Sequence, residues 1–176
     1  NSDIDTPEFE RGVTDFIKVC NVVKTFKNTR ILQVGPRPFD FWNVICNEGE
    51  LLERYNISLS PVPIKELVQE IERVKVEESS EVGKVISYFT ENTVVQIKDH
   101  DLEMVAALKV ALQNLCENYG CNSGVIQCWT ALQDEIGILP YASLSLLQEE
   151  GIPFVCETDV HGAISELLVE AASLGE

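Results

Sequence analysis

Four short, continuously apolar segments constrain the fold of this chain more than any other feature of its sequence. They span residues 31–34, 57–62, 124–129 and 152–156. A strand without polar alternation is buried on both faces, which is typical of a parallel sheet covered by helices. The sequence therefore predicts an α/β fold.

Longer stretches with apolar residues at helical spacing separate these segments. Thr6-Pro7 is a typical N-cap and first helical residue, and we expect a helix from there to about residue 28. Further helices are predicted within 39–55, 63–118, 140–150 and 160–174. This alternation predicts a three-layer sandwich around a four-stranded parallel sheet, with right-handed crossovers and the flavodoxin-like, or Rossmann-like, order 2-1-3-4. We interpret residues 1–176 as one domain.

Charge and cysteine pattern exclude several classes of function. The formal net charge is −16, so binding to nucleic acid or to an anionic membrane surface is not expected. No apolar run is long enough to span a membrane. The six cysteines form no CxxC pair, which argues against a zinc site and favours reduced thiols and a cytoplasmic location.

The loops that leave the carboxyl ends of the strands are the expected place for a ligand in such a sheet. The loop after the first strand, residues 35–42, carries Arg37 between two prolines and lacks a GxGxxG pattern. A dinucleotide site is therefore disfavoured. Arg37 could hold a substrate oxygen, or it could form a structural ion pair or a subunit contact.

Four acidic residues follow the third and fourth strands, namely Asp134, Glu135, Glu157 and Asp159. Carboxylates gathered at one edge repel one another unless a cation or shared protons relieve them, and a hard divalent metal is the usual relief. The same groups could move a proton between adjacent carbons. The pattern thus indicates a metal or catalytic site at this edge.

Structural roles account for the same residues equally simply. Asp159 precedes a predicted helix and is a good N-cap, and His161 fits a surface position in the first turn of that helix. Trp42 and Trp129 could flank a sugar ring or serve only in packing. The residue types alone leave these alternatives open.

Several stretches resemble the middle domain of L-fucose isomerase-related proteins, which belong with the arabinose isomerases in one superfamily. The segment Cys156-Glu157-Thr158-Asp159, followed by Gly162-Ala163 and a helix, is the most specific part of the resemblance. The other matching stretches are residues 9–13, 30–42, 47–52, 127–129, 146–147 and 151–153.

The resemblance implies a metal-dependent isomerase that interconverts an aldose and a ketose through an enediol. By position, Glu135 and Asp159 match two acids that bind a divalent ion, typically manganese, and act in proton transfer; Asp134 competes with Glu135 for the first place. The third ligand is a histidine of a C-terminal domain. Arg37 and Trp129 are then candidate contacts to a monosaccharide.

The resemblance also implies limits. The chain matches the middle domain only, without the N- and C-terminal domains, so we expect weak manganese binding and little turnover from this segment alone. The related proteins are hexamers, and a homo-oligomer is expected of the full-length protein. The alternative interpretation is a sugar-binding or sensory α/β module without catalysis.

Overall fold

A four-stranded parallel sheet in the order β2-β1-β3-β4 forms the centre of the computed structural model, which describes residues 3–174. The strands are β1 (Arg30–Val34), β2 (Ser58–Val62), β3 (Ser123–Ile126) and β4 (Phe154–Cys156). The predicted fold class and strand order are confirmed. The third strand is shorter than expected, because the chain leaves the sheet after Ile126 and not after Trp129. Residues 1–2 and 175–176 of the predicted domain lie outside the described part.

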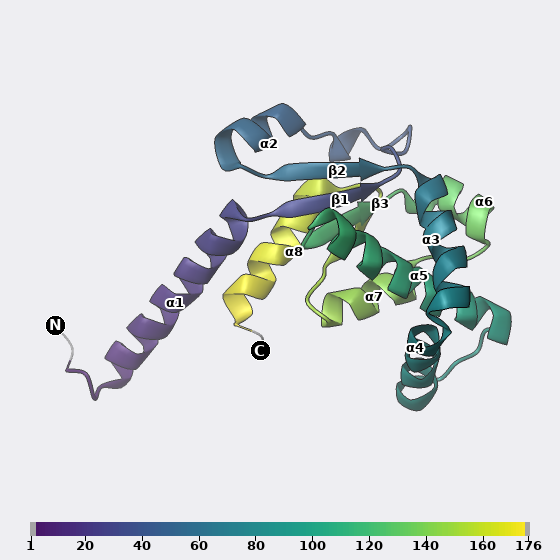
Figure 1. The fold of residues 1–176 in the computed structure, drawn as a ribbon. Coiled ribbons are helices and arrows are strands. Elements are labelled where there is room, and N and C mark those ends of the chain that lie inside the picture. The colour runs from purple at the N-terminus through teal and green to yellow at the C-terminus, as the bar shows by residue number, and fades with distance from the viewer. Residues whose placement is uncertain (1–2, 175–176) are drawn as a thin grey trace.

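Helices cover both faces of the sheet (Figure 1). Their order and bounds are α1 (Pro7–Lys27), α2 (Glu48–Tyr55), α3 (Ile64–Glu77), α4 (Ser79–Asn92), α5 (Asp99–Tyr119), α6 (Gln133–Ile136), α7 (Tyr141–Glu149) and α8 (Val160–Ser173). A short 3-10 helix, Trp42–Val44, and a single wide turn, Cys128–Leu132, complete the described elements. Among residues 3–174, none of the helices combines the length and apolar character needed to cross a membrane.

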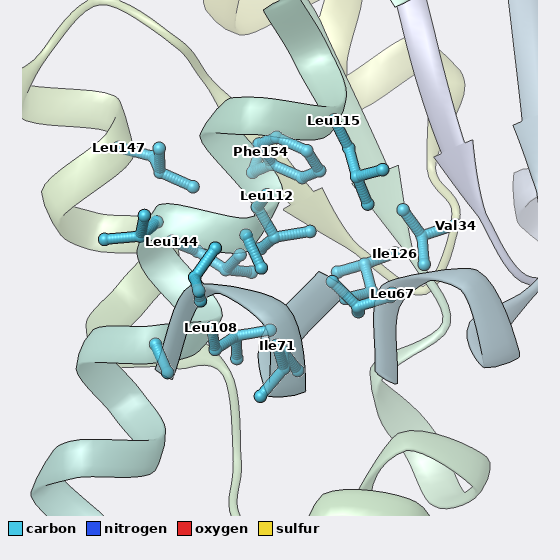
Figure 2. Packing of buried hydrophobic residues seen from close by; sticks show 14 of the residues in the cluster. Val34, Leu67, Ile71, Leu108, Leu112, Leu115, Ile126, Leu144, Leu147 and Phe154 are labelled. Carbon is cyan, nitrogen blue, oxygen red and sulfur yellow. The ribbon is translucent and has the colours of Figure 1, made fainter. Parts of the chain in front are cut away.

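The larger hydrophobic core lies between the sheet and the helices α3, α5 and α7. The strands contribute Val34 and Ile126, and the central helix α5 contributes Leu108 and Leu112, both fully buried (Figure 2). Leu67 of α3 packs in the same core. This core accounts for the long segment between the second and third strands, which folds into three helices on one face.

A smaller core covers the opposite face. Ile31 and Val125 point to this side because successive residues of a strand alternate between faces. They pack against Ala163 and Ile164 of α8 and against Leu51 of α2. β1 and β3 therefore contribute buried residues to both layers, as their continuous apolar sequences predict, whereas the buried residues of β2 and β4, Val62 and Phe154, belong to the larger core.

Helix α1 begins where the sequence predicts. The hydroxyl of Thr6 accepts a hydrogen bond from the Phe9 amide (3.3 Å), and Pro7 occupies the first helical position. The C-terminal half packs along α8, where the Asn21 amide donates to the Ala171 carbonyl (2.7 Å). No residue of α1 is buried, and its contact with the smaller core is made by half-buried Phe26 near its C-terminal end.

Candidate active site at the carboxyl edge of the sheet

The loop after β1 is ordered by its own arginine. Nη1 of Arg37 donates hydrogen bonds to the carbonyl oxygens of Pro38 (3.0 Å), Phe39 (3.2 Å) and Phe41 (3.0 Å). The guanidinium also lies 5.2 Å from the centre of the Trp42 ring. Arg37 thus holds the shape of its loop, and its predicted contact to substrate remains a prediction.

Gly35 allows the same loop to pass close to the strand-3 loop. Its φ of +80° belongs to the left-handed region, and its amide donates to the Val62 carbonyl (2.9 Å). A β-carbon at this position would stand 2.9 Å from Oε1 of Gln127. The close approach brings the loops after β1 and β3 together.

Trp129 lies at the junction of these two loops. Its side chain is 52% exposed and packs edge-on against Phe41, with ring centres 6.0 Å apart. An indole that is half exposed beside a binding edge presents an apolar surface to solvent, as a sugar-stacking residue must. The placement suits the predicted contact without testing it.

The acids after β3 lie on the short helix α6. Asp134 and Glu135 both occupy its first turn and both are exposed. Their exposure leaves each carboxylate accessible to solvent and to a ligand. Both therefore remain candidates for the first predicted acid.

A strained turn follows β4. Glu157 and Thr158 have φ values of +63° and +54°, and a β-branched residue in the left-handed region is a clear outlier. Such strain costs about 1–3 kcal/mol per residue and is found preferentially at functional sites. The surroundings hold the turn: the Thr158 amide donates to the Ile126 carbonyl (3.2 Å), and Thr158 is 3% exposed.

This turn fixes the position of Asp159. Oδ1 of Asp159 accepts a hydrogen bond from the Gly162 amide (3.0 Å) at the start of α8, so the predicted N-cap is confirmed. A β-carbon on Gly162 would stand 2.7 Å from Oδ2 of Asp159. The glycine therefore makes room for the carboxylate.

Two side chains near Asp159 were not singled out from the sequence. Burial raises the pKa of Glu166, and the charge of Asp159 raises it further. Burial is also the main cause that raises the pKa of the Cys46 thiol. The negative charge of Glu48 and, more weakly, that of Asp159 raise this pKa further. No sequence signal marks this grouping, because Cys46 lies between the 3-10 helix and α2, far from Asp159 in the sequence.

Cys128 and Cys156 form a thiol pair at the ends of β3 and β4. The hydrogen bond from Cys156 lowers the pKa of Cys128 to about 7, against the opposing effect of burial. The same hydrogen bond, together with burial, raises the pKa of Cys156. The negative charge of Glu157 raises the pKa of both thiols.

The edge does not by itself assemble a complete metal site. Within residues 3–174, no three His, Cys, Asp or Glu side chains are grouped so as to hold a metal ion. The carboxylates of Glu135 and Asp159 suit a hard divalent ion by donor type, but not by number. His161 is exposed and borders a cleft with Tyr55 and Glu50 of α2.

Two large clefts lie away from this edge. One, of about 670 Å³, separates α1 from α8, and another, of about 540 Å³, lies among α4, α5 and α7.

No protein-family model matches the chain. The chain is similar to proteins named sulfoquinovose isomerase from Priestia aryabhattai and Priestia megaterium, with 24% identity over 159 residues that make up 90% of this chain and 35% of each relative. The protein of that name from Alkalicoccus urumqiensis is 24% identical over 172 residues, or 97% of this chain and 38% of the relative. The chain thus spans little more than a third of the length of the curated relatives it matches.

Proposed function

We propose that this chain is part of an aldose–ketose isomerase that moves a sugar carbonyl between C1 and C2 through an enediol. The observation that carries the proposal is the position of Asp159, held by the Gly162 amide next to a strained turn at the carboxyl edge. The similarity to sugar isomerases over at least 90% of the chain supports it. More specifically, we propose a reaction of the L-fucose or L-arabinose isomerase type.

Asp159 and Glu135 are the groups we assign to proton transfer. An enediol forms when a base removes the proton next to the carbonyl and an acid supplies one to the carbonyl oxygen. The hydrogen bond to Gly162 fixes one oxygen of Asp159 and so orients the second. Glu135 lies on α6, which follows the neighbouring strand β3 in the sequence, and its side chain is exposed.

The same two carboxylates would hold a divalent ion such as Mn²⁺, with the remaining ligand supplied from outside the residues described. When bound, the ion polarises the substrate oxygens. The described residues offer two oxygen donors of the right kind, so the proposal requires a further ligand for tight binding.

Arg37 and Trp129 are the proposed contacts to the sugar. Trp129 offers an exposed ring face, and Arg37 orders the loop whose Phe41 packs against that ring. The substrate is then a monosaccharide. Sulfoquinovose is the first candidate, followed by L-fucose and L-arabinose, and we expect the full-length protein to be a homo-oligomer.

A sugar-binding module without catalysis is the second candidate. One observation favours it: the described residues contain no group of three potential metal ligands. The two candidates differ in what Asp159 does, because a binding module needs its hydrogen bonds and an isomerase needs its proton transfer.

An isomerisation assay of the full-length protein with manganese and a panel of aldoses tests the proposal. Glu135→Gln and Asp159→Asn should each abolish turnover, and Asp134→Asn, one residue away on the same exposed turn, is the matched control that should retain it. If Asp134→Asn abolished turnover and Glu135→Gln retained it, Asp134 would replace Glu135 as the assigned acid. Sugar binding without turnover by any aldose would favour the binding module.

A manganese titration of the 176-residue chain tests the ligand count separately. Two carboxylates should bind the ion only weakly, with a dissociation constant well above about 1 µM. A submicromolar dissociation constant for manganese would contradict the proposal that a further metal ligand comes from outside the described residues.

A further inference from the structure

Helix α1 carries an apolar stripe that its own domain leaves uncovered. The N-terminal half of the helix extends away from the sheet and its covering helices (Figure 1). None of its 21 residues is buried. Phe16, near the middle of the helix, is 68% exposed, which is unusual for a side chain of this size.

The stripe has the spacing of a coiled-coil seam. Its residues recur at alternating steps of four and three, and together they cover two heptads. They are Phe9, Val13, Phe16, Cys20 and Val23, all of them exposed. In the heptad nomenclature, Val13 and Cys20 occupy a positions, and the other three occupy d positions.

The rest of the fold does not fill this seam. Contact with α8 is made by the side of α1 that carries Asn21. Beside it, the cleft of about 670 Å³ leaves Ile17, Cys20 and Lys24 open to solvent on its α1 wall. A second, smaller hollow borders Phe9, Glu10 and Val13 in the first turns. Open space therefore adjoins the seam at both ends of the helix.

The charges beside the seam select the partner. The e positions are Glu10, Ile17 and Lys24, an acid and a base placed symmetrically about an apolar residue. In an antiparallel pair of helices, e positions face e positions, so Glu10 of one copy meets Lys24 of the other, twice. In a parallel pair, e positions instead face the g positions of the preceding heptad, so Lys24 would meet uncharged Val19 and Glu10 would meet the like charge of Asp5.

We propose that α1 is a homodimerisation helix that pairs antiparallel with α1 of a second copy of this chain, with the twofold axis close to Ile17. Val13 then packs against Val23 of the second copy, and Phe16 packs against Cys20. Glu10 in the first turn of each helix then meets Lys24 in the last turn of the other, and the antiparallel arrangement aligns the two helix dipoles favourably. This inference does not rest on the proposed catalytic function.

A charge swap tests the pairing directly. Glu10→Lys and Lys24→Glu each place like charges together at both ends of the pair and should raise the dimer dissociation constant about tenfold or more. The double variant, Glu10→Lys with Lys24→Glu, restores opposite charges and should return the constant to near the wild-type value. Glu8→Lys is the matched control, because position c lies away from the seam.

Sedimentation of the chain and its variants at concentrations up to about 100 µM measures these constants. Phe16→Ser should give a monomer, and circular dichroism together with the thermal midpoint reports whether the domain remains folded. A monomeric wild type overturns the proposal and assigns the seam to another segment or protein. A dimer that the single swaps leave intact, or that the double swap fails to restore, overturns it as well.

Discussion

Phe154 of β4 stands directly across the sheet from Gly124 of β3, and its ring fills the space that a β-carbon on Gly124 would occupy. All four residues of β3 are buried, and Phe154 of β4 is 4% exposed. The glycine is therefore required by close packing between neighbouring strands and not by backbone conformation. It also sets how closely β4 approaches β3, and so where the turn before Asp159 lies.

Gly124→Ala should destabilise the protein by about 1–3 kcal/mol, because the ring must leave its rotamer or the strands must separate. Urea unfolding measures the change. Gly83→Ala is the control: Gly83 lies in α4, and a β-carbon placed there would have nothing within 4 Å, so alanine should stabilise the helix by about 0.5–1 kcal/mol. Equal effects at the two sites would contradict the packing argument.

The N-cap of α8 separates the structural role of Asp159 from its proposed catalytic role. Asp159→Ala removes the acceptor for the Gly162 amide and should cost about 0.5–2 kcal/mol of stability. Asp159→Asn keeps a good N-cap and should unfold close to the wild type while losing turnover. Thermal unfolding and the isomerisation assay are run on the same samples. An Asn variant as unstable as the Ala variant would show that the charge, and not the cap, stabilises this turn.

The thiol pair at the ends of β3 and β4 should titrate in two widely separated steps. Because the hydrogen bond from Cys156 lowers the pKa of Cys128 to about 7, the ultraviolet absorbance of thiolate should rise near neutral pH. Cys156→Ala removes the donor, so burial should raise the pKa of Cys128 instead. Cys116→Ala is the control, since burial raises the pKa of Cys116 to about 12 and its removal should leave the neutral step unchanged.

The same pair predicts the pH dependence of stability. The folded pKa of Cys128 lies below that of an unfolded thiol, about 8.5, so its contribution grows as pH rises from about 7 and is lost as pH falls through 7. Folding raises the pKa of Cys156, so the contribution of this thiol to stability is lost as pH rises above about 8.5, the pKa of an unfolded thiol. Stability should therefore rise and then fall across this range, and a monotonic profile in urea would contradict the coupling.

Most of the fold could be predicted from local sequence patterns. Continuous apolar runs identified all four strands, and Thr6 and Asp159 were recognised as caps because capping depends on residues three positions apart. The early end of β3 was missed, since Cys128 and Trp129 are apolar and continue the run while the backbone turns away. The pattern of apolar residues indicates which residues are buried, but it does not indicate where the chain leaves the sheet.

The surroundings of the candidate site depended on tertiary structure. Cys46 and Glu166 each share an electrostatic interaction with Asp159. Cys46 lies just before α2, far away in the sequence, and Glu166 comes from the second turn of α8. The exposed face of α1 was likewise invisible, because an amphipathic pattern predicts an apolar face but not the partner that covers it.

Lys109 provides a test of buried charge in the larger core. Its side chain is 6% exposed, and Nζ contacts Oε2 of Glu150 at 2.5 Å and donates to Oε1 of Gln113 at 2.7 Å. Glu150→Ala leaves the ammonium with one neutral partner inside the protein, whereas Lys109→Met replaces the charge with an apolar chain of similar length. Removing one member of such a pair is costly, but replacing the buried charge can be neutral.

Glu150→Ala should therefore lower the free energy of unfolding by about 1–2 kcal/mol, less than for a fully enclosed pair because Glu150 is 41% exposed. Lys109→Met should change stability by less than about 1 kcal/mol, and the double variant should be more stable than Glu150→Ala alone. Urea unfolding of the three variants measures the coupling, with Glu91→Ala on exposed α4 as the control. A double variant that loses the sum of both single effects would show that Lys109 is stabilised by solvent or by Gln113 and not by its ion pair.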